Sequence, residues 1–289
     1  MQKISVQPLP TLSSANTEVS ILRLDQLHPI VSGNKWFKLQ YYLQDAKQRG
    51  HSTIGTFGGA YSNHLVATAY AAAEAGLKSI GYIRGEAPPI LSPTLGQAIE
   101  LGMEPRYLSR LAYKERRSTI DTNDQAVYWI EEGGYGFLGA MGAAGIMQFA
   151  PAGITHVLCA VGTGTMMAGL IKGSGKHHIT GISVLKNETG SEEAIKNLLT
   201  EDELNKSWEI LHDYHFGGYA KHPPDLINFM KSFWRREQLP TDIVYTSKLL
   251  FAAQDLVAKN HFPPGSRLLI IHSGGLQGNR SLPAGTLPF

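Results

Sequence analysis

The chain has 289 residues, a formal net charge of +2 and a composition that is 43% hydrophobic and 17% charged. This near-neutral charge argues against nucleic-acid binding, and neither a signal peptide nor a run of the roughly 18 apolar residues of a membrane helix is recognisable. The single cysteine, Cys159, excludes an internal disulfide framework and favours a reducing cytoplasm, and His212 and His215 have too few partners for a metal site.

Apolar, β-branched segments alternate with helical patterns along most of the chain. Strands are predicted at 52–57, 79–84, 156–161, 180–185 and 267–272, and helices at 63–76, 93–102, 165–173, 191–199 and 247–260. The alternation predicts an α/β fold with mostly parallel, twisted sheets that helices cover on both faces. We place a large domain at residues 1–45 and 150–289 and a small domain at residues 46–149. The segment Gly133–Gly145 has too many glycines for a packed helix start, so we expect a crossing between domains or a loop that touches a ligand.

The segment Ser32–Leu39, SGNKWFKL, places two lysines three residues apart after a Gly-Asn turn. Apolar residues recur from Trp36 at helical spacing, so Lys35 is expected at the start of a helix with Lys38 one turn further on the same side. A lysine that is desolvated beside a second cation can lose its proton and act as a nucleophile that forms a Schiff base. An ordinary solvated lysine is the alternative.

The segment Thr56–His64, TFGGAYSNH, is predicted to be a strand that enters a glycine-rich turn and then a helix. Ser62 and Asn63 stand where side chains cap a helix, which is the simpler interpretation. The other interpretation is that the helix start, with its N–H groups and positive dipole end, receives an anion such as a substrate carboxylate or a phenolate.

The segment Val161–Gly169, VGTGTMMAG, has the same order of strand, glycine loop and helix. Its backbone N–H groups and threonine hydroxyls are suited to holding a phosphate. A dinucleotide site requires glycine where Met167 stands, because methionine there obstructs close packing of helix and strand. A single phosphate is therefore favoured over NAD, and a tight turn without a ligand is the remaining alternative.

Two further segments bring hydroxyl groups to loops near the C-terminus. The apolar strand at 268–272 ends in Ser273, which the rule for parallel sheets directs into a cleft. Tyr245 precedes an apolar helix, and Tyr219 lies in a loop flanked by glycine. Buried tyrosines are commonly core residues with a satisfied hydroxyl, so neither tyrosine stands out alone.

In their order along the chain, these motifs resemble those of the pyridoxal-phosphate (PLP) enzymes of the tryptophan-synthase-β fold type. Within that group the chain is similar to the branch of 1-aminocyclopropane-1-carboxylate (ACC) deaminase and D-cysteine desulfhydrase. The matching elements also include the segments Glu132–Gly134 and His272–Gly275. The resemblance implies two lobes with PLP in the cleft between them, a small amino acid as substrate, and a homodimer.

The resemblance also implies roles for individual residues. Lys35 would hold the cofactor and later move the substrate Cα proton, and Lys38 would lower the pKa of Lys35 by like-charge repulsion. Tyr219 and Tyr245 would face the substrate as acid/base or orienting groups. The other implied roles are substrate binding or protonation by Ser62, contact with the phenolic oxygen of the cofactor by Asn63, substrate contact by His64, and phosphate binding by Gly162, Thr163, Gly164 and Thr165.

Two departures from the ACC deaminases bear on the reaction. Those enzymes carry glutamate where this chain has Thr246 and glutamine where it has His64. A neutral hydroxyl from Thr246 or Ser273 cannot stabilise a protonated pyridine nitrogen as a carboxylate would, and opening the strained ACC ring requires the stronger electron sink. We therefore expect α,β-elimination from D-cysteine or another β-substituted amino acid, which yields a 2-oxo acid and ammonia. Ring opening of ACC to 2-oxobutanoate is the alternative, and a PLP- or amino-acid-binding protein without turnover is an alternative from another class.

Overall fold

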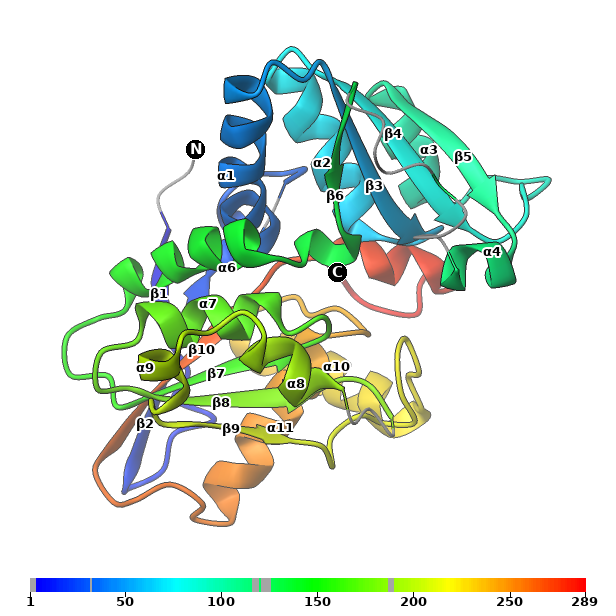
Figure 1. The fold of residues 1–289 in the computed structure, drawn as a ribbon. Helices are drawn as coiled ribbons and strands as arrows, with labels where there is room; N and C mark the ends of the chain where they lie inside the picture. The colour runs from blue at the N-terminus through cyan, green and yellow to red at the C-terminus, as the bar shows by residue number, and fades with distance from the viewer. Residues whose placement is uncertain (1–3, 32, 116–119, 121–125, 187–189) are drawn as a thin grey trace.

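Two sheets flanked by helices organise the chain (Figure 1). The computed structural model describes residues 4–31, 33–115, 120, 126–186 and 190–289. In this described part, one sheet has six strands and the other has four, and all pairings between neighbouring strands except the first are parallel. The prediction of an α/β protein with two lobes and mostly parallel sheets is confirmed.

The larger sheet uses both ends of the chain. Its strands in spatial order are β1 (Val6–Pro8), β2 (Thr17–Arg23), β10 (Ser266–His272), β7 (His156–Val161), β8 (His178–Ser183) and β9 (Trp208–Leu211). Alternate residues of β10 pack into two different cores, with Leu268 and Ile270 in one and Leu269 and Ile271 in the other. This sheet is therefore buried on both faces, as parallel sheets usually are.

The smaller sheet comes from one continuous stretch of chain. Its order is β5 (Met103–Leu108), β4 (Lys78–Arg84), β3 (Thr53–Gly59) and β6 (Val127–Ile130). Aliphatic residues of one face pack on helices, while the ring of Phe57 stacks on Trp129 with 5.6 Å between centroids and lies near Tyr82 and Tyr113.

Helices follow most strands, as the alternating pattern predicts. Their bounds are α1 (Asn34–Gln48), α2 (Asn63–Glu74), α3 (Pro93–Glu100), α4 (Arg110–Lys114), α6 (Phe137–Ala144), α7 (Thr165–Gly173), α8 (Ser191–Lys196), α9 (Glu201–Leu204), α10 (Pro224–Glu237) and α11 (Thr246–Ala258). Short 3-10 turns occupy Leu24–Gln26, Glu132–Gly134, Gly145–Phe149 and Leu276–Ser281. In the described part of the chain, none of these helices has the length and apolarity that crossing a membrane demands.

The glycine-rich segment Gly133–Gly145 meets its prediction in part, because Gly133 lines a cavity whereas Phe137–Ala144 form the helix α6. The glycines of α6 allow close packing. A Cβ on Gly142 would lie 1.9 Å from the Phe37 carbonyl oxygen of α1, and a Cβ on Gly169 of α7 would lie 2.6 Å from the Ala140 carbonyl oxygen of α6. The three helices therefore approach one another by backbone contact, which only glycine permits.

Candidate functional site

A cavity of about 800 Å³ lies where the carboxyl ends of strands from both sheets meet. The loops after β3, β7 and β10 line it together with the first turn of α1, which follows the rule for ligand sites in parallel sheets. The residues predicted from the sequence that line this cavity are Lys35, Lys38, Ser62, Asn63, His64, Gly162, Thr163, Gly164, Tyr219, Tyr245 and Ser273. Two predicted residues, Thr165 and Thr246, are fully buried and are not among the described residues that line the cavity.

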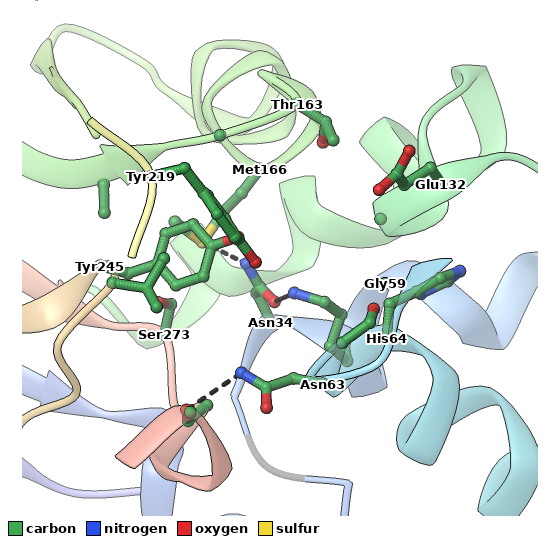
Figure 2. Close-up of a pocket in the computed structure, with 18 of the residues that line it drawn as sticks. Asn34, Gly59, Asn63, His64, Glu132, Thr163, Met166, Tyr219, Tyr245 and Ser273 are labelled. Atoms are coloured by element: carbon green, nitrogen blue, oxygen red, sulfur yellow. Dashed lines mark hydrogen bonds between the residues drawn. The ribbon is translucent and has the colours of Figure 1, made fainter. Parts of the chain in front are cut away.

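A glycine turn positions Lys35. Gly33 has φ 71°, and a Cβ there would lie 1.7 Å from the carbonyl oxygen of Ser273, so no other residue fits. The Asn34 N–H donates to the same carbonyl at 3.2 Å, and α1 therefore begins against the Ser273 loop. Lys35 is the second residue of α1, and its Nζ donates to Asn34 Oδ1 at 2.8 Å beside the cavity (Figure 2). Ser32 lies outside the described residues.

Burial sets the charge state of both lysines. Loss of solvation lowers the pKa of Lys35 to about 8, and the carboxylate of Asp242 opposes this effect. Burial and the charge of Lys35 hold the pKa of Lys38 well below its usual range. The repulsion predicted to lower the pKa of Lys35 thus falls on Lys38, because Lys38 is the first of the two to release its proton. Lys38 Nζ donates to the Gly133 carbonyl at 3.2 Å.

The turn between β3 and α2 presents an uncapped helix start to the cavity. Within the described chain, the Ser62 side chain makes no capping bond to α2, so the simple capping interpretation does not hold for this residue. Asn63 Nδ2 donates to the Gly275 carbonyl at 3.0 Å (Figure 2), and Asn63 Oδ1 is buried with no hydrogen-bond partner among the described residues. The first N–H groups of a helix lack intrahelical partners, so this turn is suited to an anionic group.

Hydrogen bonding fixes the tautomer of His64. Thr56 Oγ1 donates its only hydrogen to the Ile130 carbonyl at 2.8 Å, so it accepts from His64 Nε2–H, which is 2.8 Å away. His64 Nδ1 is then an acceptor, and it is buried without a partner among the described residues. Burial and the charges of Lys35 and Lys38 keep the pKa of His64 well below its usual range. His64 therefore adds no positive charge to the cavity at neutral pH.

The glycine loop before α7 forms the opposite wall. Gly164 has φ 80°, and a Cβ there would lie 2.7 Å from Ile195 Cγ1. Thr165 begins α7, whose start has no side-chain cap within the described chain. Thr163 Oγ1 and Thr165 Oγ1 are 3.1 Å apart, with Thr163 at the cavity and Thr165 behind it. This combination of a glycine turn and a helix start is a typical anion cradle.

Tyr219 and Tyr245 face the cavity from two separate loops (Figure 2). Their rings are 6.2 Å apart between centroids and meet edge to face at 76°. Partial loss of solvation raises the pKa of Tyr219, which is 48% exposed, while burial and the neighbouring Tyr219 raise the pKa of Tyr245 well above its usual range. Both hydroxyls are therefore protonated at neutral pH and can donate a proton.

The two hydroxyls predicted to lie near a cofactor ring have different surroundings. Ser273 lines the cavity. The Thr246 hydroxyl donates to Asp242 Oδ1 at 2.6 Å and accepts from the Asp242 N–H at 2.7 Å, so its only hydrogen is already used. The role of Thr246 as a cofactor contact stays a prediction.

Sequence reasoning missed several residues at the site. Arg84 lines the cavity, as does Glu132, which was named in a matching motif but given no role, and Asn34, noted only as a turn residue, bonds Lys35. Asp242 was not singled out. Aspartate side chains commonly accept hydrogen bonds from backbone N–H groups two or three residues further on, as Asp242 does from Val244 and Tyr245, so its residue type was the available signal.

Comparison with known proteins identifies the family. The family model described as pyridoxal-phosphate dependent enzyme matches residues 2–274. The chain belongs to this family. It is 32% identical to a protein of Pyrococcus abyssi provisionally named 1-aminocyclopropane-1-carboxylate deaminase, over 94% of this chain and 89% of that protein. It is 26% identical to a 1-aminocyclopropane-1-carboxylate deaminase of Bradyrhizobium sp., over 85% of this chain and 82% of that protein.

Solved structures agree with this assignment. The crystal structure of an ACC deaminase homologue matches this PLP enzyme with a TM-score of 0.80 and 26% identity, over 96% of this chain and 91% of that one. A fungal L-serine ammonia-lyase from Rhizomucor miehei has the same fold, with a TM-score of 0.68 and 13% identity, over 94% of this chain and 93% of that one. The family resemblance stated from the motifs is confirmed.

The cavity residues of this PLP enzyme fit the cofactor. Lys35 supplies a buried amine of lowered pKa, and the loop from Gly162 to Gly164 supplies an anion cradle. Asn63 contributes a buried amide oxygen that lacks a partner among the described residues. These groups would hold an aldehyde, a phosphate and a polar ring substituent, and the volume of about 800 Å³ leaves room for a small substrate.

Proposed function

We propose that this enzyme converts a small amino acid with a leaving group on Cβ into a 2-oxo acid and ammonia by α,β-elimination. In the balanced reaction, one amino acid that carries X on Cβ and one water give the 2-oxo acid, ammonia and HX. The observation that carries the proposal is that Lys35, an amine of lowered pKa at the start of α1, lies in the same cavity as two protonated tyrosines, Tyr219 and Tyr245.

Each group has a task in this reaction. When bound, the cofactor supplies an aromatic ring that accepts the electrons released at the substrate Cα. Lys35 Nζ holds the cofactor and takes the Cα proton. The hydroxyl of Tyr219 or Tyr245, protonated at neutral pH, gives a proton to the departing group X. Ser62 lies beside the uncapped start of α2, whose N–H groups bind the substrate carboxylate.

D-cysteine or a related β-substituted amino acid is the substrate class that we favour. The site offers Ser273 as a neutral hydroxyl, with Thr246 occupied by Asp242, and a neutral partner gives a weaker electron sink than a carboxylate. ACC deamination is the second candidate, and the names of the relatives from Pyrococcus abyssi and Bradyrhizobium favour it.

A substrate panel tests the proposal. The purified protein with PLP is incubated with D- and L-amino acids and with ACC, and keto acid, ammonia and sulfide are measured. We expect keto acid from a β-substituted amino acid, and Lys35→Ala should lower turnover by on the order of a thousandfold or more and abolish the absorbance of bound cofactor. Lys38→Ala should keep that absorbance and slow turnover.

Lys47→Ala is the matched control, because Lys47 is an exposed lysine on the same helix, α1. It should leave both turnover and absorbance unchanged. Cofactor absorbance that shifts with amino acids but yields no keto acid would instead identify a binding protein without turnover. Keto acid from ACC alone would select the second candidate.

We further propose that residues 1–45 and 150–289 form a large domain and residues 46–149 a small one. In support, the strands of the smaller sheet run from Thr53 to Ile130, and those of the larger sheet lie before and after them. The family resemblance supports a homodimer, which light scattering would measure. The buried free thiol of Cys159 is compatible with a cytoplasmic location.

A further inference from the structure

The loop that carries Tyr219 has a backbone conformation that most residues avoid. Phe216 and Ala220 have φ of 52° and 55°, and Gly217 and Gly218 have φ of 92° and 116°. Positive φ is unfavourable for phenylalanine and alanine, so this loop does not hold its shape through its own preferences. Its conformation requires contacts from elsewhere in the protein.

Lys248 provides such contacts, although it is not among the described residues that line the cavity. It belongs to α11 and is fully buried. Its Nζ donates to the carbonyl of His215 at 2.9 Å and to the carbonyl of Gly218 at 2.7 Å. These two carbonyls bracket the start of the strained stretch, and an ammonium group has enough hydrogens to serve both.

Asp242 holds the second tyrosine from the same buried region. Its carboxylate accepts from the N–H of Tyr245 at 2.9 Å and from the N–H of Thr246 at 2.8 Å. Burial lowers the pKa of Lys248 to about 8, and the charge of Asp242 opposes that effect. A buried cation is tolerated when an opposite charge and hydrogen-bond acceptors accompany it. Two opposite buried charges thus stand behind the loop of Tyr219 and the turn of Tyr245.

We propose that Lys248 is a positioning residue that holds the Tyr219 loop, so that the Tyr219 hydroxyl stays against Tyr245 at the cavity. Its effect on turnover rests on the proposed function, whereas the anchoring is a property of the chain itself and is measurable without cofactor. If Lys248 only filled space, methionine, which has similar length and no donor, would replace it without consequence.

Hydrogen exchange on the cofactor-free protein tests the anchoring. In Lys248→Met, amides of residues 215–221 should exchange faster by on the order of tenfold, while those of β10 keep their protection. Lys259→Met is the matched control, because Lys259 lies at the exposed end of α11 and pairs with Asp255 there. Equal exchange of the loop in Lys248→Met and in the unmodified protein would overturn the proposal, whether or not the enzyme is active.

A kinetic double-mutant cycle tests whether Lys248 acts through Tyr219. Lys248→Met should lower kcat by on the order of tenfold or more, with KM and cofactor absorbance within about twofold of the unmodified enzyme. Added to Tyr219→Phe, it should lower kcat little further, because the group that it positions has already lost its hydroxyl. A full further loss in that background would contradict the proposal.

Two further outcomes, an inactive unmodified protein and a variant that does not fold, also decide between the proposals. An unmodified protein that turns over no panel substrate would refute the proposed function and leave hydrogen exchange to judge the anchoring. If Lys248→Met does not fold, Lys248→Gln, which can still donate to one carbonyl, enters the same experiments. Failure of both to fold would overturn the proposal, because Lys248 would then be required by the core rather than by one loop.

Discussion

Lys35 owes its nucleophilic form to burial in the cavity wall rather than to a neighbouring positive charge. With a pKa of about 8, roughly one amine in ten is neutral at pH 7. That fraction is roughly 300 times the fraction for an ordinary lysine with pKa 10.5. The protein therefore keeps a usable nucleophile at neutral pH without a dedicated base.

The pH dependence of cofactor capture should report this pKa. Because the neutral amine is the reactive form, the rate at which cofactor-free protein captures pyridoxal phosphate should rise with pH and level off above about 8. Stopped-flow absorbance measures the rate. N-acetyl-lysine methylamide, measured in the same buffers, is the control. It shows how much of the pH dependence comes from pyridoxal phosphate itself rather than from Lys35. A protein curve that keeps rising in parallel with that of the free lysine would show that burial does not lower the pKa of Lys35.

Where a motif stood at the end of a strand, the sequence indicated which residues would line the cavity, although their roles stay predictions. Ser62, Gly162 and Ser273 could be assigned to one cleft because parallel strands bring their carboxyl ends together. Contacts between distant segments could not be predicted. Met167 was expected to obstruct helix packing, yet a Cβ on Gly181 of β8 would lie 2.4 Å from its Sδ, so a glycine on the strand makes the room. No local pattern reveals that pairing.

Among the elements, α6 depends most directly on glycine. It packs against α1 and α7 where a side chain on either surface would collide with backbone. Backbone cannot move aside as a flexible side chain can, so these contacts tolerate little extra volume. Since α1 carries Lys35, the packing of α6 also affects the position of the cofactor lysine.

Gly142→Ala should therefore destabilise the protein by about 2 kcal/mol or more, because its Cβ would lie 1.9 Å from the Phe37 carbonyl oxygen. Urea unfolding measures the change in the free energy of unfolding. Gly145→Ala is the matched control, since the nearest atom to its Cβ would be 3.9 Å away and its φ is −61°. It should be neutral or slightly stabilising. Equal effects of the two substitutions would mean that α6 can shift to admit a methyl group.

The elements found from the sequence are those with fully buried, apolar strands, such as β7 and β10. Strands with mixed patterns were missed. β5 contains Pro105 between the charged residues Glu104 and Arg106, and all four residues of β9 are only partly buried. These strands form through pairing with neighbours at the sheet edges, which local composition does not encode.

At the scale of the whole molecule, loops from both sheets line one cavity. A ligand that contacts both should stabilise the folded state by mass action, by about 2.7 kcal/mol at a hundred times its Kd. At that concentration we expect pyridoxal phosphate to raise Tm by about 4 to 5 °C in differential scanning fluorimetry. Lys35→Ala should reduce this shift, and Lys47→Ala should preserve it. An unchanged Tm on cofactor addition would contradict binding at this cavity.

The neighbours of β2 set an order of events during synthesis. β2 (Thr17–Arg23) leaves the ribosome long before its parallel partner β10 (Ser266–His272), and Gly33 long before the carbonyl of Ser273 against which it packs. In a growing polypeptide the larger sheet therefore lacks a central strand until β10 has been synthesised. A nascent chain that lacks β10 and Ser273 also lacks the surface on which α1, the helix of Lys35, begins, so it should not capture vitamin B6.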